Sequence, residues 1–181
     1  MKNAIFEKDL FRYYGEAGET KKRRLFRPKE LTYIFFFRQV QSTKNVLLKY
    51  YYKFKLRKIS EKTLIQIPAS TKIGEGFYIG HTGRLIINEE AVLGKNINVA
   101  TGVTIGQESR GKRKGCPTIG DNVWIGTNSV IVGNIKIGND VLIAPLTFVN
   151  FDVPDHSVVI GNPARIISKE NATEGYVNNR I

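Results

Sequence analysis

The sequence IGDNVWIGTNSVI, residues 119–131, is the clearest part of a stretch from Ile67 to Pro154 in which aliphatic residues recur six positions apart. They form three series: Ile67, Ile73 and Ile79; Ile87, Leu93, Val99 and Ile105; and Ile119, Ile125, Ile131, Ile137, Ile143 and Val149. An α-helix repeats every 3.6 residues and a strand every two, so neither explains a period of six. A period of six is typical of a parallel β-helix, in which short strands stack coil upon coil.

Each hexapeptide supplies one short strand and one corner, and three of them close a triangular coil of about eighteen residues. The aliphatic residue points inward and stacks on its equivalents in neighbouring coils, because no single coil can bury its own apolar face. The stretch is long enough for about four coils. Glycine and asparagine suit the corners, where they adopt a positive φ at low cost. The asparagines expected there are Asn96, Asn122, Asn128 and Asn139.

Two interruptions break this repeat. Ile79 and Ile87 are eight residues apart, so the segment from His81 to Arg84 lies in an expanded corner. Between the second and third series lies a polar segment, residues 107–116, that is rich in glycine and basic residues and is predicted to loop out. Loops held on a rigid scaffold often carry the chemistry of a protein.

These features divide the chain into three parts. Residues 1–65 form a basic, mainly helical region, residues 66–167 the β-helix with its loop 107–116, and residues 168–181 a polar tail that we expect to be partly disordered. The charge is concentrated in the first part, which holds 17 Lys and Arg against 6 Asp and Glu, whereas the remainder holds 11 against 10. This asymmetry favours a partner with an acidic surface.

The first part should contain a short irregular or helical lead, with the basic run Lys21–Arg24, followed by two helices at residues 29–41 and 44–58. Pro28 is a plausible first-turn residue of the first of these helices. Their apolar faces could cover the open end of the β-helix or pack on another subunit. Alternatively, their basic and aromatic side chains could lie on a membrane surface. Nucleic-acid binding is disfavoured because no recognisable module is present.

Some classes of protein are disfavoured by composition. The single cysteine, Cys116, cannot form an internal disulfide, which fits a reducing cytoplasm. The N-terminus has no apolar segment of signal-peptide length, and no apolar run approaches the roughly 20 residues that span a bilayer. We therefore expect a cytoplasmic protein, peripheral to the inner face of the membrane if the basic region binds lipid. Two histidines and no Cys/His cluster argue against a metal site and against a γ-class carbonic anhydrase.

The hexapeptide run, the His81-Thr82-Gly83 break, the basic loop and the segment Gly161-Asn162-Pro163-Ala164-Arg165 together resemble the hexapeptide-repeat acyltransferases, which have a left-handed β-helix. The chain looks most like their serine acetyltransferase-like branch, which also includes sugar O-acetyltransferases of capsule and O-antigen synthesis. The resemblance covers roughly residues 60–168. It implies a homotrimer, acetyl-CoA as acyl donor, and acetyl-CoA sites in the clefts between adjacent prisms.

His81 matches the catalytic histidine of that family. A hydroxyl attacks a thioester slowly unless a base removes its proton, and a histidine with a near-neutral pKa suits this role. The protonated imidazole can then protonate the departing thiolate. His156, the other histidine, is interpreted as a surface or rim residue.

The acceptor site departs from the serine enzymes. Gln66 matches an Asp that supports their histidine, Gly80 an Asp beside it, and Gly115 and Cys116 an Arg-His pair. A zwitterion needs a carboxylate for its ammonium group and a cation for its carboxylate. Because these charges are absent here, we expect the acceptor to be a sugar hydroxyl of a glycan intermediate in surface polysaccharide synthesis. Cys116 is expected to be a packed or pocket-wall residue.

The resemblance also implies backbone contacts with acetyl-CoA at corners that face the cleft. The residues expected to bind it are Gly126, Thr127, Ala144, Pro145, Asn162, Arg165 and, in the loop, Lys112. Pro145 has no N–H, so neighbouring amides would have to compensate. The basic residues of the loop could equally form a solvated surface.

The main functional hypothesis is therefore a sugar O-acetyltransferase. The alternatives are a serine O-acetyltransferase with an altered pocket and a non-enzymatic β-helix scaffold. An ice-binding β-helix is disfavoured because the threonines do not fall at one phase of the repeat.

Overall fold

A computed structural model describes residues 3–18, 20 and 25–181, so the basic run Lys21–Arg24 lies outside the described residues. The N-terminal part contains α1 (Ala4–Tyr14), the short 3₁₀ helix η1 (Gly15–Ala17), α3 (Lys29–Ser42) and α4 (Val46–Thr63). The two predicted helices are thus confirmed, and α4 continues to Thr63. Within the described residues, no helix combines the length and apolar character needed to cross a membrane.

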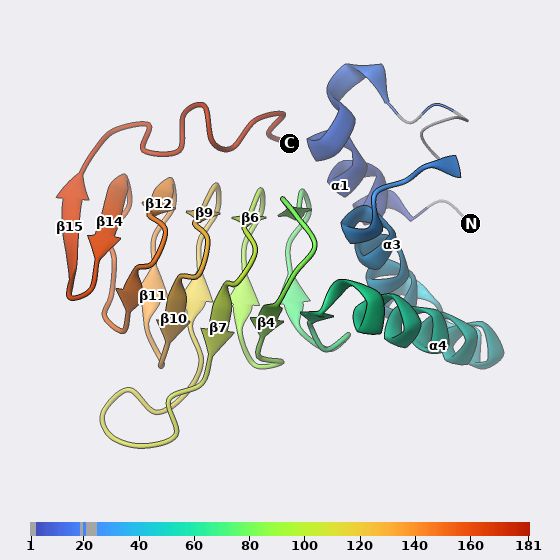
Figure 1. The fold of residues 1–181 in the computed structure, drawn as a ribbon, viewed down its shortest axis with the longest axis horizontal. Helices are drawn as coiled ribbons and strands as arrows, with labels where there is room; N and C mark the ends of the chain where they lie inside the picture. The colour runs from blue at the N-terminus through green and yellow to red at the C-terminus, as the bar shows by residue number, and fades with distance from the viewer. Residues whose placement is uncertain (1–2, 19, 21–24) are drawn as a thin grey trace.

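The rest of the chain forms a β-helix whose strands build three sheets (Figure 1). Sheet A contains β1 (Ile65–Gln66), β4 (Leu85–Ile87), β7 (Thr104–Gly106), β10 (Val130–Val132) and β13 (Phe148–Val149). Sheet B contains β2 (Lys72–Ile73), β5 (Val92–Leu93), β8 (Thr118–Ile119) and β11 (Lys136–Ile137). Sheet C contains β3 (Tyr78–Ile79), β6 (Asn98–Val99), β9 (Trp124–Ile125), β12 (Val141–Ile143), β14 (Ser157–Gly161) and β15 (Ala164–Ser168).

The strands pair in parallel, apart from the antiparallel pair β14–β15 at the far end. All members of the three aliphatic series are buried and stack inside the triangular section, as the period of six predicts. The solenoid has about five turns, because sheet A stacks five strands, whereas the sequence predicted about four coils. The difference arises at the ends, where β1 and β14 lie outside the stretch Ile67–Pro154 that carries the repeat.

The corners mostly follow the prediction. Asn96, Asn122 and Asn128 have φ of 55°, 56° and 59°, the left-handed conformation that asparagine tolerates. Asn139 also lies in a corner, but there the next residue, Asp140, adopts the left-handed conformation, with a φ of 52°. The Asn139 side chain instead accepts a hydrogen bond from the backbone N–H of Asp121 in the neighbouring coil.

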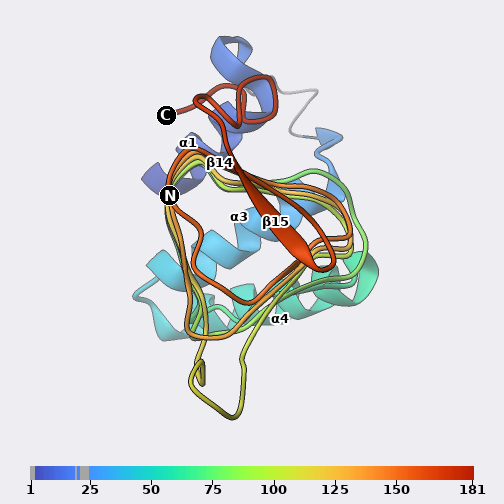
Figure 2. The same cartoon turned by 90° about the vertical axis from the view of Figure 1, so that its left-hand side faces the viewer.

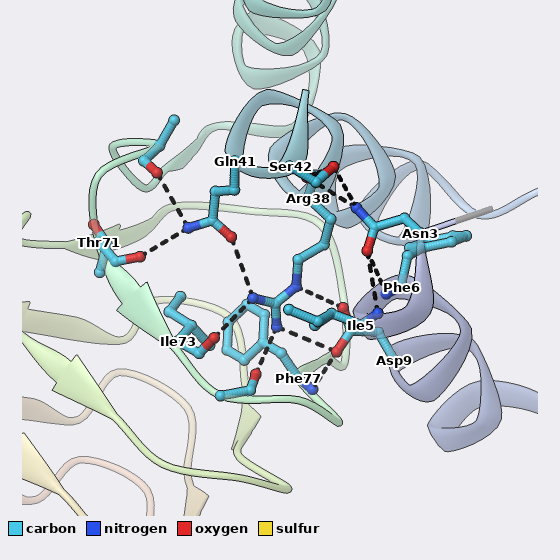
Figure 3. A network of polar contacts seen from close by, with 12 residues as sticks. Asn3, Ile5, Phe6, Asp9, Arg38, Gln41, Ser42, Thr71, Ile73 and Phe77 are labelled. Carbon is cyan, nitrogen blue, oxygen red and sulfur yellow. Dashed lines mark hydrogen bonds and ion pairs between the residues drawn. The ribbon is translucent and has the colours of Figure 1, made fainter. Parts of the chain in front are cut away.

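A buried ion pair joins the N-terminal helices to the first coil (Figure 3). Arg38 on α3 donates through Nε to Asp9 on α1 over 2.7 Å, and its other nitrogens donate to the carbonyls of Ile73 and Gly74 over 2.7 and 2.6 Å. Asp9 also accepts the backbone N–H of Phe77 over 2.8 Å. One pair therefore ties two helices and the beginning of the β-helix together, so α3 covers the open end as expected.

The C-terminal tail is ordered, contrary to the expectation of partial disorder. It runs back along the outer face of sheet C towards α1 (Figure 1), where the rings of Trp124 and Tyr176 lie 4.9 Å apart. Its last residue, Ile181, donates its backbone N–H to Asn96 over 3.1 Å. The tail lacks a repeat of its own, and its order comes from contacts that the local sequence does not reveal.

Asp140 anchors the start of this tail. Its carboxylate accepts hydrogen bonds from the backbone N–H groups of Ala172 and Thr173 and from the Thr173 hydroxyl, over 2.6–3.0 Å. It also lies 2.9 Å from Nδ1 of His156. Partial burial raises the pKa of Asp140, but the hydrogen bonds from Thr173, His156 and the two amides outweigh it and lower this pKa to about 2. The hydrogen bond with Asp140 raises the pKa of His156.

These shifts predict that the tail is held most tightly in mildly acidic solution. The stabilisation from Asp140 is present above its unfolded pKa of about 4 and is lost as the pH falls through about 2. The stabilisation from His156 is complete below its unfolded pKa of about 6.5 and is lost as the pH rises through its raised folded pKa. The protection factor of the Thr173 amide, which compares its exchange rate with that of an unstructured peptide at the same pH, should be highest between about pH 4 and 6. In the variant His156→Gln, the loss of Thr173 protection above about pH 6 should disappear, whereas the loss in acid should remain. If the wild type and the variant showed the same pH dependence of protection, His156 would not be the group that titrates on the neutral side.

Candidate functional site

The triangular section gives the β-helix three edges, and two of them carry the predicted site residues. We call the edge where sheet C passes into sheet A the His81 edge; its corners are residues 80–84, 100–103, 126–129 and 144–147, and it ends at the turn 161–163. The loop edge is the one where sheet A passes into sheet B, and the loop 107–116 projects from it (Figure 2). With about 4.8 Å between coils, the His81 edge is about 19 Å long.

His81 occupies the first corner of its edge. This corner is two residues longer than the repeat, and the His81 side chain is exposed there. Gly83 holds the corner in place: its backbone N–H donates to the carbonyl of Thr63 at the end of α4 over 2.9 Å. Gly83 has a φ of +136°, and an added Cβ would lie 2.2 Å from Oγ1 of Thr101 in the next coil. The corner is thus clamped between α4 and the second coil, and only glycine fits this position.

The imidazole of His81 is exposed, and it has no hydrogen-bond partner within the described part of the chain. Gln66, which matches the supporting Asp of the serine enzymes, lies on β1 and lines a hollow with Lys53, Arg57 and Tyr33. Gln66 makes no hydrogen bond with His81.

Gly80 immediately precedes His81, and its surroundings have room for a Cβ. Its φ is not in the left-handed region, and an added Cβ would lie 3.8 Å from the Val99 carbonyl oxygen and 3.9 Å from the Tyr78 ring. Both are ordinary van der Waals distances, so the backbone tolerates a side chain here. Neither backbone conformation nor packing around a Cβ therefore requires glycine at this position.

The other corners of the His81 edge are flat and expose backbone groups. Gly126 approaches Pro145 so closely that an added Cβ would lie 2.5 Å from the Pro145 nitrogen. The N–H groups of Thr101 and Thr127, one coil apart, have no partner among the described residues, whereas Pro145 offers no N–H at the next level. Ala144 is buried, and its small side chain does not project from the surface of this edge.

The edge ends at the β14–β15 turn, which contains Asn162 and a cis bond between Asn162 and Pro163. The backbone N–H of Gly161 donates to Oγ1 of Thr147 over 3.2 Å, which places this turn directly above the fourth corner. Arg165 follows the turn on β15, opposite Ile160, and its side chain is exposed. The structure therefore aligns most of the predicted acetyl-CoA residues with His81: Gly126, Thr127, Ala144, Pro145 and Asn162 lie on one edge, with Arg165 next to its end.

Three predicted site residues lie elsewhere. Lys112, Gly115 and Cys116 belong to the loop edge, so one chain does not bring them to His81. Gly115 closes the base of the loop, where it exchanges two backbone hydrogen bonds of 3.0 Å with Glu108. Its φ of +132° is a conformation that favours glycine, so the backbone accounts for the residue at this position. Lys112 is exposed at the tip.

Cys116 is half-buried against the core. Burial, with a smaller contribution from Glu90, raises the pKa of its thiol, which does not suit a nucleophile. His156 lies at the corner between sheets B and C, where it contacts Asp140, so its interpretation as a surface residue agrees with its structural role. Among the described residues, no group of three or more His, Cys, Asp or Glu side chains could hold a metal ion.

Comparison with known proteins gives this arrangement a context. Residues 116–150 match the family model described as bacterial transferase hexapeptide (six repeats). Residues 116–150 therefore carry the hexapeptide repeat of this family model. The third aliphatic series, from Ile119 to Val149, lies entirely within the matched residues, so the repeat accounts for the coils stacked there.

Sequence relatives include serine acetyltransferase 4 of Arabidopsis thaliana, which is 38% identical over 61% of this chain and 31% of its own length. A serine acetyltransferase of Staphylococcus epidermidis is 38% identical over 62% of this chain and 53% of its own length. The chain thus spans about a third to a half of the curated relatives it matches.

Solved structures extend the likeness over the N-terminal helices. Serine acetyltransferase from Brucella abortus has a TM-score of 0.76 and 26% identity, covering 94% of this chain and 70% of that one. A serine acetyltransferase in complex with CoA has a TM-score of 0.71 and 26% identity, covering 91% and 68%. These matches are to serine acetyltransferases, so they favour the alternative hypothesis over the sugar acceptor that the sequence led us to expect.

Proposed function

We propose that this chain is an acetyl-CoA-dependent O-acetyltransferase in which His81 is the general base. The observation that carries the proposal is the geometry of the His81 edge. The exposed His81 lies at one end of a row of corners built from small residues, in which the backbone N–H groups of Thr101 and Thr127 have no partner among the described residues. The likeness to serine acetyltransferases, one of them solved with CoA, supports acetyl-CoA as the donor. The amides of Thr101 and Thr127 are free to donate to the carbonyl groups of an extended pantetheine arm.

In the proposed reaction, His81 accepts the proton of the acceptor hydroxyl as its oxygen attacks the thioester carbonyl. The tetrahedral intermediate then collapses, the C–S bond breaks, and the imidazolium returns the proton to the sulfur of CoA. The products are the O-acetyl ester and CoA with a free thiol, so no further reactant is needed. The exposed position of His81 suits this role because both substrates must reach it.

We propose a homotrimer as the working form. The outer face of sheet A, between the His81 edge and the loop edge, carries the half-buried side chains of Ile86, Val130, Val132 and Phe148. Such a row of apolar side chains favours contact with another chain. Association through this face would bring the loop edge of one chain, with Lys112, towards the His81 edge of another.

L-Serine is the first acceptor to test, because the relatives and the solved structures are serine acetyltransferases. A second candidate, an uncharged hydroxyl such as that of a sugar, is favoured by one specific observation. Gly80 has room for a side chain and carries none, so no carboxylate there meets the ammonium group of an amino acid.

The test is thiol release from acetyl-CoA, with L-serine and with a panel of nucleotide-linked sugars. We expect Gly80→Asp to raise kcat/KM for L-serine at least about tenfold, because a carboxylate beside His81 would pair with the ammonium group. Gly80→Asn is the matched control of equal size without charge and should give no such gain.

Turnover of L-serine by the wild type would support the first candidate, and turnover of sugars alone would support the second. Absence of turnover with every acceptor, together with absence of acetyl-CoA binding by calorimetry, would contradict the proposed function.

A further inference from the structure

Helix α4 has two apolar faces, and only one of them is used inside the chain. Tyr52, Leu56, Ile59 and Thr63 follow one another at intervals of three or four residues and face the interior, where α4 packs on α3 and the first coil. This inward face accounts for the attachment of α4 to the rest of the molecule.

The second face points to solvent. Val46, Leu47, Tyr50, Tyr51 and Phe54, which follow the pattern i, i+1, i+4, i+5, i+8, form one stripe on the opposite side of the helix. Their exposed fractions are 64%, 81%, 68%, 51% and 57%. We call these five residues the outer stripe of α4. Figure 1 shows α4 at the end of the molecule remote from β15, with open space on its outer side.

Lysines flank the outer stripe on both sides. Lys49 and Lys53 lie along one side, and Lys55 and Lys58 along the other, as their helical spacing requires. The Lys53 ammonium lies 5.9 Å from the centre of the Tyr50 ring, and that of Lys55 lies 5.5 Å from the centre of the Tyr51 ring. Lys49 and Lys53 also line a shallow hollow of about 230 Å³ with Val46 and Tyr50.

The charge of α4 decides which partner fits the stripe. The helix contains six basic residues and a single acid, Glu61, which is already paired with Arg57 and Lys58. A second copy of α4 laid on this face would bring like charges together. A nucleic acid would satisfy the lysines but leave the aliphatic and aromatic centre of the stripe uncovered. An anionic lipid surface satisfies both, since its head groups meet the lysines while its acyl boundary receives the apolar side chains.

We propose that the outer stripe of α4 and its flanking lysines dock this protein on an anionic lipid bilayer, with α4 lying in the plane of the interface. This inference does not depend on the proposed acetyl transfer. It has a consequence for the site, because α4 ends at Thr63, whose carbonyl accepts the N–H of Gly83 in the His81 corner. The docked helix would thereby hold the His81 corner close to the lipid surface.

The proposal is tested by flotation of the full-length protein with two kinds of vesicle. One kind is phosphatidylcholine alone, and the other contains about 30% phosphatidylglycerol, which supplies the negative surface charge. We expect binding to the anionic vesicles only, and a loss of binding as salt rises from about 0.05 to about 0.5 M, because salt screens the lysines.

Three double variants separate the contributions. Leu47→Ser with Phe54→Ser removes the centre of the stripe and should abolish binding, and Lys49→Gln with Lys53→Gln should weaken it at least about tenfold. The matched control is Lys72→Gln with Lys136→Gln, which removes two exposed lysines from sheet B and should leave binding unchanged.

The proposal is overturned if the wild type fails to float with anionic vesicles, or if the control loses as much binding as Lys49→Gln with Lys53→Gln. It is also overturned if the double variant Leu47→Ser with Phe54→Ser still binds vesicles but has a smaller molar mass in solution than the wild type, as measured by light scattering. That last result would assign the stripe to contact between copies of the chain.

Discussion

Replacing His81 with alanine is expected to lower kcat/KM for acetyl transfer by about 10²–10⁴-fold, the usual contribution of a positioned general base. The side chain is exposed and makes no hydrogen bond within the described residues, so its removal should change the free energy of unfolding by less than about 0.5 kcal/mol. Thiol release from acetyl-CoA measures the first quantity, and urea denaturation measures the second.

The control for this prediction is His156→Ala, which removes the other histidine of the chain. His156 lies on a different edge of the β-helix and contacts Asp140, so its loss should loosen the tail and leave kcat unchanged. Equal losses of kcat in both variants would show that the activity depends on the general integrity of the fold, and the assignment of His81 as base would be wrong.

Replacing Asp9 with alanine is expected to destabilise the protein by about 3–5 kcal/mol, the cost of leaving a buried charge unpaired. Arg38 and Asp9 have side chains that are 1% and 0% exposed, so water cannot replace the missing carboxylate. The Phe77 amide would lose its acceptor in the same variant. Urea denaturation monitored by circular dichroism would measure this loss.

An exposed ion pair at the same junction provides the comparison. Glu75 pairs with Lys8 over 2.5 Å and with Lys95 over 3.2 Å, but the lysine side chains are about half exposed. Glu75→Ala should therefore cost less than about 1 kcal/mol. Replacing both buried partners with apolar residues, as in Asp9→Leu with Arg38→Met, should cost less than Asp9→Ala alone. If Asp9→Ala were no more harmful than Glu75→Ala, the buried pair would not hold the helices to the first coil.

The fold could be predicted from the sequence because its main signal is periodic. Each inward residue of the β-helix, such as Ile105 or Ile131, repeats the environment of its neighbours, so the pattern itself describes the packing. The helices α3 and α4 were also predictable from apolar spacing. The second apolar face of α4 could be seen only when the first face was assigned to the interior.

The tail and the division of the site between two edges could not be predicted in the same way. The order of residues 171–181 depends on Asp140 and Asn96, which are remote in sequence and look like ordinary corner residues. The sequence grouped Lys112 with Gly126, although they lie on different edges, because a hexapeptide pattern does not reveal which corners align after a long insertion. Thr101, which faces Gly83 and limits the His81 corner, gave no signal in the sequence.

The path of the tail bears on how the molecule unfolds. In a solenoid each repeat contacts only its neighbours, so the terminal coil can normally fray without disturbing the rest. Here the chain returns from the last coil to the first, and Asn179 near its end donates to the carbonyl of Arg12 on α1 over 3.3 Å. Unfolding of the last coil would release the tail and so break its contacts with α1 at the opposite end. The tail therefore couples the stability of the last coil to that of the first. The two ends of the β-helix should therefore melt together, as one cooperative unit.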